Sequence, residues 1–233
     1  MRVPLTRYGR DTMLYATGIL GGLAALQIVT GTWPAALLWG LMWIGMLSFF
    51  RDPERHAKCS PDDLLSPADG VVRDVEEVSP PAFLNGPAIR IGVFMSVLDV
   101  HVNRSPADGV VRWVSYHPGS FHDARARDAV TQNEHNFLGL ELSEGRRIMV
   151  NQVAGVLARR IVCAAAVGDR LERGQRFGMV KFGSRVELYL PVADEYEVRA
   201  RPGDRVKAGL TVLATRADRR SSPQPGSQGR TGA

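Results

Sequence analysis

The octapeptide Ser66-Pro-Ala-Asp-Gly-Val-Val-Arg73 occurs twice in the 233-residue chain, the second time at residues 105–112. In each copy, Pro followed by Asp-Gly has the composition of a turn, and the two valines begin a β-like run. A second repeat, Gly-Asp-Arg plus an apolar residue, begins at Gly168 and again at Gly203, and each copy ends at another glycine. These repeats predict hairpin turns that are used more than once in one β fold.

Short apolar runs separated by Gly, Pro, Asn and Asp extend outward from these turns. The run Val186-Glu187-Leu188-Tyr189-Leu190 alternates as β-strands do. The Gly-Asp repeats resemble the hammerhead barrels of lipoyl and biotinyl carriers. We therefore predict a mainly β, barrel- or sandwich-like catalytic domain with hammerhead elements, preceded by an N-terminal hydrophobic helical hairpin. Strands are expected over residues 71–78, 88–95, 110–116, 137–142, 147–153, 186–190, 196–200 and 210–214.

Two apolar stretches fill the N-terminal part, residues 13–30 and 35–50, with Gly31-Thr32-Trp33-Pro34 between them. As helices, each would cover about 25 Å, slightly less than the roughly 30 Å hydrocarbon core of a bilayer. A transmembrane hairpin and a hairpin that dips in from one face both remain open. A cleaved signal peptide is disfavoured, because a second apolar stretch follows without a clear cleavage site. Basic flanks predict that both ends face the cytoplasm: Arg2, Arg7 and Arg10 before the block, Arg51, Arg55 and Lys58 after it.

The formal net charge of +5 suits either nucleic acid or an anionic membrane. The sequence has no long basic run and no zinc-finger or RNA-binding signature, so nucleic acid is not expected as a partner. Cys59 and Cys163 are too few and too far apart for a disulfide framework, which favours a reduced, cytoplasmic domain. We predict a membrane-anchoring hairpin at residues 1–51, a catalytic domain at 52–215 and a flexible tail at 216–233.

The dipeptide Gly183-Ser184 lies between two of the β-like runs. Glycine permits backbone conformations that most residues cannot adopt. A serine after a strained glycine can attack the preceding carbonyl through a five-membered cyclic intermediate and convert the amide to an ester. Gly-Ser is also among the commonest turn dipeptides, so the dipeptide alone does not identify a site.

A polar segment, Asp99-Val-His-Val-Asn-Arg-Ser-Pro106, follows the apolar run 91–98. A lone histidine is usually structural, but His101 at the end of a strand, among Asp, Asn and Arg, is typical of a site. Asp69 in the first octapeptide can orient it, as the carboxylate does in a Ser-His-Asp arrangement. Asp108 occupies the same place in the second octapeptide and is an internal control for an ordinary turn aspartate.

Taken together, these motifs resemble the short form of the phosphatidylserine decarboxylase proenzyme family. The likeness runs in order from about residue 51 to residue 215. Its motifs are the turn at Asp69, Asp-x-His-x-Asn-Arg-x-Pro at 99–106, Asn-Glu-His-Asn at 133–136, Gln-Val-Ala-Gly at 152–155, Arg-Arg-Ile at 159–161 and Phe-Gly-Ser at 182–184.

The resemblance implies an enzyme that decarboxylates phosphatidylserine to phosphatidylethanolamine with a pyruvoyl group made from Ser184. Ser184, His101 and Asp69 are the implied catalytic residues. Self-cleavage between Gly183 and Ser184 yields a large piece, residues 1–183, and a small piece, residues 184–233, which stay together as a heterodimer, with higher oligomers left open. The enzyme is expected at the cytoplasmic side of the cell membrane, with all its chemistry beyond Arg51.

The pyruvoyl ketone forms a Schiff base with the substrate amine, a task that usually falls to pyridoxal phosphate. The sequence has no convincing pyridoxal-lysine context, since its only lysines are Lys58, Lys181 and Lys207. Pyridoxal phosphate is therefore not expected, and the resemblance implies that no metal is needed.

One position departs from the family pattern. Longer members carry His-x-x-His-x-Pro here, and the second histidine is replaced by Arg104. His101 then serves both in self-cleavage and in proton return, or else His117, His122 or His135 takes one role. Arg104 instead suits a carboxylate or a phosphate. The candidates for substrate binding are Arg104, Asn133 and His135.

Other protein classes fit part of the sequence. A membrane-anchored lipoyl or biotinyl carrier fits Met179-Val-Lys-Phe182, but leaves the segment around His101 without a purpose. A barrel-type zinc peptidase needs a His-x-His ligand pair, which the sequence lacks. A pyruvoyl decarboxylase for another headgroup or a soluble amino acid is the nearest rival, and the apolar block favours a phospholipid.

Overall fold

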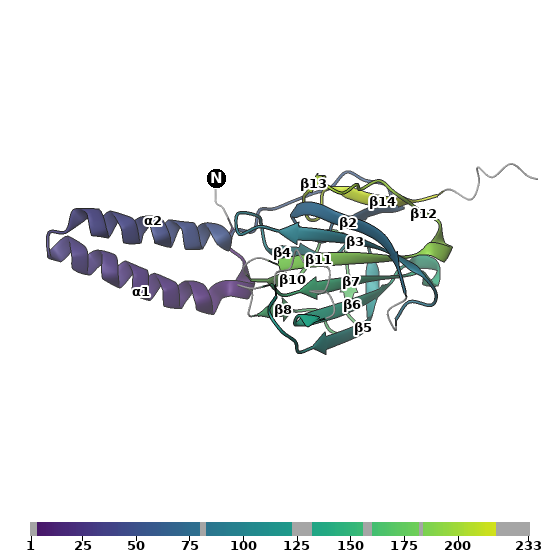
Figure 1. The fold of residues 1–233 in the computed structure, drawn as a ribbon, viewed down its shortest axis with the longest axis horizontal. Helices are drawn as coiled ribbons and strands as arrows, with labels where there is room; N and C mark the ends of the chain where they lie inside the picture. The colour runs from purple at the N-terminus through teal and green to yellow at the C-terminus, as the bar shows by residue number, and fades with distance from the viewer. Residues whose placement is uncertain (1–3, 80–82, 123–131, 156–159, 182–183, 218–233) are drawn as a thin grey trace, which may run out of the picture.

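A helical hairpin projects from a β domain in the computed structural model, which describes residues 4–79, 83–122, 132–155, 160–181 and 184–217 (Figure 1). A short 3-10 helix, η1 (Arg7–Gly9), leads into α1 (Arg10–Val29), and α2 (Trp33–Phe49) returns beside α1. The segment Arg7–Val29 is long and apolar enough to cross a membrane, and α2 is shorter. Leucines and isoleucines along both helices are exposed, as lipid-facing side chains would be.

Strands are the main regular structure in the rest of the described chain. Their bounds are β1 (Asp63–Leu65), β2 (Gly70–Val78), β3 (Ala88–Met95), β4 (Val102–Arg104), β5 (Gly109–His117), β6 (His135–Glu141), β7 (Arg147–Val153), β8 (Ile161–Cys163), β9 (Arg170–Leu171), β10 (Arg176–Val180), β11 (Ser184–Pro191), β12 (Tyr196–Val198), β13 (Arg205–Val206) and β14 (Val212–Arg216). The 3-10 helices η2 (Ser143–Gly145) and η3 (Val192–Asp194) follow β6 and β11.

One large, curled sheet dominates the β domain and has the order β13-β2-β3-β11-β7-β6-β5-β9 (Figure 1). Neighbouring strands in it are antiparallel. Two smaller sheets have the orders β1-β14-β12 and β4-β10-β8. The same arrangement occurs twice. The first octapeptide leads into the long strand β2, which pairs with the short edge strand β13 of the second Gly-Asp repeat. The second octapeptide leads into β5, which pairs with the short edge strand β9 of the first Gly-Asp repeat.

The large sheet buries apolar side chains on both faces. Val186, Leu188 and Leu190 of β11 belong to the main core, whereas Tyr189 belongs to a second cluster with Met149. Because successive strand residues point to opposite faces, Ser184 shares the face of the main core, and the residue after it faces the other cluster.

The prediction of a mainly β domain after apolar helices is confirmed, and the strands expected at 88–95 and 147–153 coincide with β3 and β7. Turns at the Gly-Asp repeats are confirmed by positive φ angles of 99° at Gly168 and 98° at Gly203. The prediction that they are hairpin turns is wrong, because the strands that follow them, β9 and β13, pair with β5 and β2 and not with their neighbours in sequence. The strands β1, β4, β8, β9, β10 and β13 were not predicted, because runs this short show little alternation, whereas β14 overlaps the strand expected at 210–214. Arg216, the expected start of the tail, ends β14, and residues 218–233 lie outside the described residues.

Candidate active site

Ser184 opens β11 in the middle of the large sheet, between β3 and β7. It is fully buried and lies opposite Met95. Its Oγ has no hydrogen-bond partner among the residues that the structure describes. A buried hydroxyl without a partner is unfavourable for folding, so it calls for a functional explanation. Phe182 and Gly183, which complete the expected cleavage motif, lie outside the described residues.

His101 lies in the connection between β3 and β4 and is fully buried. Its Nδ1 is 2.9 Å from the main-chain oxygen of Asp99, which can only accept a hydrogen bond. In the neutral ring Nδ1 therefore carries the proton, and Nε2, which has no partner within the described ranges, keeps a free lone pair. Burial lowers the pKa of His101 to about 4, against smaller opposing effects of Asp99 and Asp69. This side chain is a neutral proton acceptor.

Strand pairing directs His101 and Ser184 to the same part of the fold. Val102 of β4 lies opposite Met179, one residue before the end of β10. His101, which directly precedes Val102, therefore lies near the end of β10. The chain runs from the end of β10 to Ser184 in four residues. Ser184 also lies opposite Met95, the last residue of β3, and His101 belongs to the connection that leaves β3. The candidate base and nucleophile thus belong to the region where β3, β4, β10 and β11 converge.

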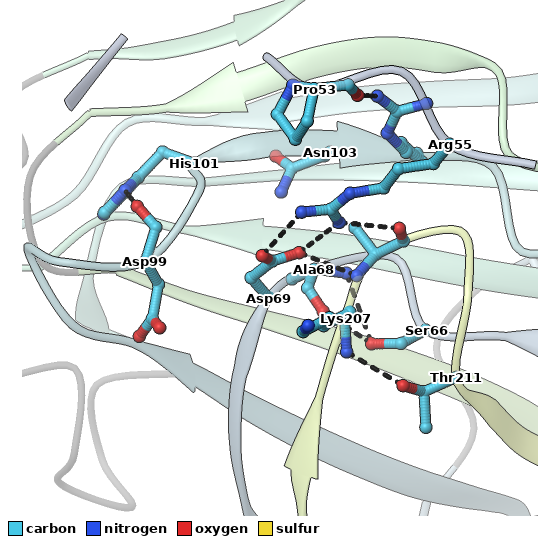
Figure 2. Close-up of polar contacts among 12 residues, drawn as sticks. Pro53, Arg55, Ser66, Ala68, Asp69, Asp99, His101, Asn103, Lys207 and Thr211 are labelled. Carbon is cyan, nitrogen blue, oxygen red and sulfur yellow. Dashed lines mark hydrogen bonds and ion pairs between the residues drawn. The ribbon is translucent and has the colours of Figure 1, made fainter. Parts of the chain in front are cut away.

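Asp69 lies just before β2, and protein groups hold its carboxylate. The Arg55 guanidinium contacts it at 2.5 and 2.8 Å, and the Ala208 N–H donates to Oδ1 at 2.8 Å. Figure 2 shows the carboxylate turned toward Arg55, while the hydrogen bond of His101 goes to Asp99. The hydrogen bond expected between Asp69 and His101 is therefore not among the contacts of the described residues, and Asp69 influences His101 as a nearby charge.

The helical hairpin touches the candidate base. Phe49, the last residue of α2, packs on the ring of His101 with 4.3 Å between ring centroids. Phe49 also belongs to an apolar cluster with Met13, Phe50 and Met179, which joins the hairpin to the β domain. The hairpin thus supplies part of the apolar surroundings of His101, and the expectation that all the chemistry lies beyond Arg51 stays a prediction. No sequence signal marks Phe49, because it is one apolar residue in an apolar helix.

A buried ion-pair network holds the chain directly after Ser184 and was also missed. The Arg185 guanidinium lies 2.6 Å from Asp74 and 2.8 Å from Glu187. Glu187 in turn accepts a hydrogen bond from the Tyr189 hydroxyl at 2.6 Å. Since neighbouring strand residues face opposite sides, this network fixes the start of β11 from the face away from the Ser184 hydroxyl. Asp74 is distant in sequence from the other three members, so no local motif identifies the network.

His135 and His117 lie on the other face of the sheet from Ser184. His135 lies opposite Val153, and Val153 lies opposite Arg185. Residues opposite one another share a face, so His135 shares a face with Arg185 and not with Ser184. His117 lies opposite His135 and stacks on it at 4.7 Å. The sheet therefore separates both histidines from the serine.

Arg104 is engaged by protein oxygens. It contacts Asp52 at 2.9 Å, the Pro53 carbonyl at 2.8 Å and the Gly174 carbonyl at 3.0 Å. These contacts tie the exit of the hairpin to the β domain. Substrate binding by Arg104 stays a prediction, and its contacts give it a structural task.

Asn133 is likewise engaged. Its Oδ1 accepts from the His122 N–H at 2.8 Å, and its Nδ2 donates to the carbonyls of His122 and Ala154 at 2.8 Å each. The Nδ1 of His135 lies 2.7 Å from the Asn133 carbonyl. Substrate binding by Asn133 and His135 stays a prediction.

Comparison with known proteins gives a consistent result. A family model described as phosphatidylserine decarboxylase matches residues 45–214. Three similar proteins are each named phosphatidylserine decarboxylase proenzyme. The one from Symbiobacterium thermophilum is 47% identical over 196 residues, 84% of this chain and 90% of the relative. The one from Ruegeria pomeroyi is 45% identical over 188 residues, covering 76% and 85%. The one from Carboxydothermus hydrogenoformans is 40% identical over 213 residues, covering 91% and 98%.

Proposed function

The chain belongs to the phosphatidylserine decarboxylase family, and on that premise we propose that it cuts itself between Gly183 and Ser184 and converts Ser184 into a pyruvoyl group. The observation that carries this proposal is the buried Ser184 hydroxyl, which lacks a partner among the described residues. A hydroxyl that makes no hydrogen bond stabilises nothing, whereas a nucleophile has to be free to react. The neutral His101, with its free Nε2, supports the proposal as the base.

Self-cleavage begins when Nε2 of His101 takes the Ser184 hydroxyl proton and Oγ attacks the Gly183 carbonyl carbon. The peptide C–N bond breaks, the nitrogen takes a proton, and Gly183 is left as an ester on Oγ. Removal of the α-proton of residue 184 then expels the Gly183 carboxylate by β-elimination. The dehydroalanine that remains tautomerises, and water hydrolyses it to a pyruvoyl group and ammonia.

Decarboxylation follows in the processed enzyme. The pyruvoyl group supplies the electron sink that the loss of carbon dioxide from an amino acid requires. Each turnover consumes one proton, and His101 is the candidate that delivers it to the α-carbon of the product, after its free Nε2 has taken the proton up from solvent. The position of His117 and His135 on the other face of the sheet favours His101 for both tasks. Phe49 and the carbonyl of Asp99 orient its ring and keep it away from water.

The two pieces are expected to stay together without a covalent link. Past the cleavage point, β11 pairs with β3 and β7, β13 pairs with β2, and β14 pairs with β1. Separation would leave these backbone groups and the apolar face of β11 without partners. The exposed apolar hairpin would hold the complex at the cytoplasmic face of the cell membrane, where the lipid substrate lies.

The test is denaturing electrophoresis of the full chain with an intact mass for each band. The wild type should give residues 1–183 and a small piece that begins at residue 184 with a blocked N-terminus. Ser184→Ala should remain one chain and release no carbon dioxide. Ser105→Ala is the matched control, because that buried hydroxyl bonds the carbonyl of Ala107 and should not be needed for cleavage. A wild type that is active as one uncut chain would contradict the proposal.

A further inference from the structure

Two cavities adjoin at the junction of the hairpin and the β domain. One is a cleft of about 380 Å³, lined chiefly by polar side chains: Arg7, Arg10, Asp11, Thr12, Arg160 and Lys181. The other is an apolar cavity of about 280 Å³, lined by Leu5, Met13, Leu14 and Leu47 together with Arg10 and Thr17. Arg10 lines both, so a cationic cleft and an apolar cavity share one side chain as a wall.

The cleft has an excess of positive charge that the protein leaves uncompensated. Among the residues that the structure describes, four cationic side chains line it and Asp11 is the one carboxylate. Arg7, Arg10 and Arg160 are exposed, and within the described ranges none of them makes an ion pair. By contrast, the neighbouring Arg176 contacts Asp52 at 2.6 Å. Free guanidinium groups gathered in one cleft suit an anion with several oxygens, above all a phosphate.

Lys181 connects this cleft to the candidate active site. Its Nζ donates to the Thr12 hydroxyl at 3.1 Å, and its side chain is buried between α1 and the β domain. Burial, and next the charge of Arg160, lower the pKa of Lys181, so an anion in the cleft would relieve an unfavourable situation. Lys181 precedes Ser184 by three residues, which an extended chain spans in about 10 Å. The cleft therefore adjoins the part of the chain that leads to residue 184.

The position along the hairpin fits a lipid as the occupant. The cleft lies where α1 begins, between the apolar helices and the β domain, which is the depth of the phosphates if the hairpin enters a bilayer. The apolar cavity lies on the side of the hairpin toward its exposed leucines. Charge and polarity thus change in the same order as along a phospholipid, from phosphate to acyl chain.

We propose that these two cavities form one binding site for a single glycerophospholipid, with its phosphodiester between Arg10 and Arg160 and an acyl chain in the apolar cavity. The inference rests on the proposed function, because it makes this lipid the substrate that is presented to residue 184. It assigns substrate recognition to the phosphodiester, and it uses residues on both sides of the junction, one from the hairpin and one from the β domain.

The test uses processed, full-length enzyme and dihexanoyl phosphatidylserine below its critical micelle concentration, which removes any effect of a charged membrane surface. In Arg10→Gln/Arg160→Gln we expect KM to rise roughly 10- to 100-fold, as the loss of charge-assisted hydrogen bonds predicts, with a much smaller change in kcat. Arg170→Gln is the control. Arg170 is an exposed arginine in another cleft, and none of the residues described as lining that cleft belongs to the hairpin. An unchanged KM in the double variant would overturn the inference.

A binding experiment separates this inference from the proposed chemistry. Uncut Ser184→Ala protein is titrated with dihexanoyl phosphatidylserine, dihexanoyl phosphatidylcholine and inorganic phosphate by calorimetry. Both lipids should bind, and both should be weakened by Arg10→Gln/Arg160→Gln, because they share the phosphodiester. Weakening confined to phosphatidylserine would mean that the arginines hold its carboxylate, and inorganic phosphate binding as tightly as the lipids would mean a plain anion site. Either outcome overturns the inference. A wild type that neither cleaves nor decarboxylates would defeat the proposed function and leave this titration valid.

Discussion

The two copies of the octapeptide build the same turn in two different surroundings. In both, the serine hydroxyl donates to the carbonyl two residues on, at 2.7 Å. In both, a glycine N–H reaches the serine carbonyl at 2.9 Å, from Gly209 to Ser66 and from Gly174 to Ser105. The backbone pattern is therefore duplicated, and whatever distinguishes the copies comes from elsewhere in the chain.

The two aspartates show the difference. Asp69 accepts the N–H of Ala208 at 2.8 Å, and Asp108 accepts the N–H of Arg173 at 2.9 Å, so each has the same local task. The side chain of Asp69 is 10% exposed and is covered by Arg55, whereas that of Asp108 is 70% exposed. The covering arginine comes from the segment that leaves the hairpin, and only the first turn lies under it.

The two octapeptide regions have similar backbones but contribute different residues to the candidate site. Asp69 belongs to the first octapeptide, but His101 precedes the second by four residues. The corresponding position before the first octapeptide is Asp62, which is exposed. A duplicated scaffold can thus keep its fold in both halves, while each half supplies a different group to one site.

The largest expected effect on the rate of self-cleavage comes from replacing His101 by alanine, with the corresponding residue Asp62 as the comparison. His101→Ala should slow self-cleavage about 10²- to 10⁴-fold, because a buried hydroxyl loses its proton acceptor. Asp62→Ala should cleave at the rate of the wild type. The measurement is the fraction of cut chain with time after denatured proenzyme is refolded. Equal rates for the two variants would remove His101 from the cleavage step.

The next largest effect is expected when the stability and cleavage rate of Asp69 and Asp108 variants are compared. Asp69→Asn leaves Arg55 buried without its charge partner, so we expect the free energy of unfolding to fall by about 3 kcal/mol and cleavage to slow about 10-fold. Asp108→Asn should change the stability by no more than about 0.5 kcal/mol. Urea unfolding of both variants in a Ser184→Ala background gives the stabilities without cleavage. A similar loss in both variants would mean that the two turns are equivalent after all.

A smaller effect is expected at the contact between hairpin and base. Phe49→Ala should admit water to His101 and slow cleavage several-fold, and Phe49→Leu should restore most of the rate, since burial is what the contact provides. Leu41→Ala is the control, because Leu41 is an exposed side chain of the same helix. Removal of residues 1–50 should then impair cleavage as well as membrane attachment. A truncated protein that is folded and cleaves normally would show that the hairpin is only an anchor.

The smallest effect is the response to pH. Since burial lowers the pKa of His101 to about 4, the base stays neutral down to that pH, and the cleavage rate should be nearly constant between pH 8 and about 5.5. The rate should fall as the pH drops through about 4, where the ring gains its proton. The stopped-flow or quenched rate is measured on proenzyme refolded at each pH. A fall centred near pH 6.5 would mean that His101 titrates as it does in water.

The sequence singles out those members of the candidate site that carry recognisable chemistry. Ser184, His101 and Asp69 stand in local motifs, and the long strands show apolar alternation, so both could be predicted. The partners could not. From the sequence, Arg55 is interpreted as one of the basic residues that flank a membrane segment, although it binds Asp69. Phe49 is one apolar residue among many, although it packs on His101. The hydrogen-bond acceptor for His101 is a main-chain carbonyl, which any residue at position 99 would supply. Contacts between segments far apart in sequence depend on packing, which no local pattern encodes.

The most direct test of the account is to attach the substrate to residue 184. Wild-type enzyme is incubated with phosphatidylserine and sodium cyanoborohydride, and the small piece is analysed by mass spectrometry with fragmentation. The account predicts that the small piece gains the mass of the reduced lipid adduct at its first residue, and that Ser184→Ala gains none. A small piece with a free serine at its N-terminus in an active enzyme, or lipid attached to a lysine instead, would contradict it.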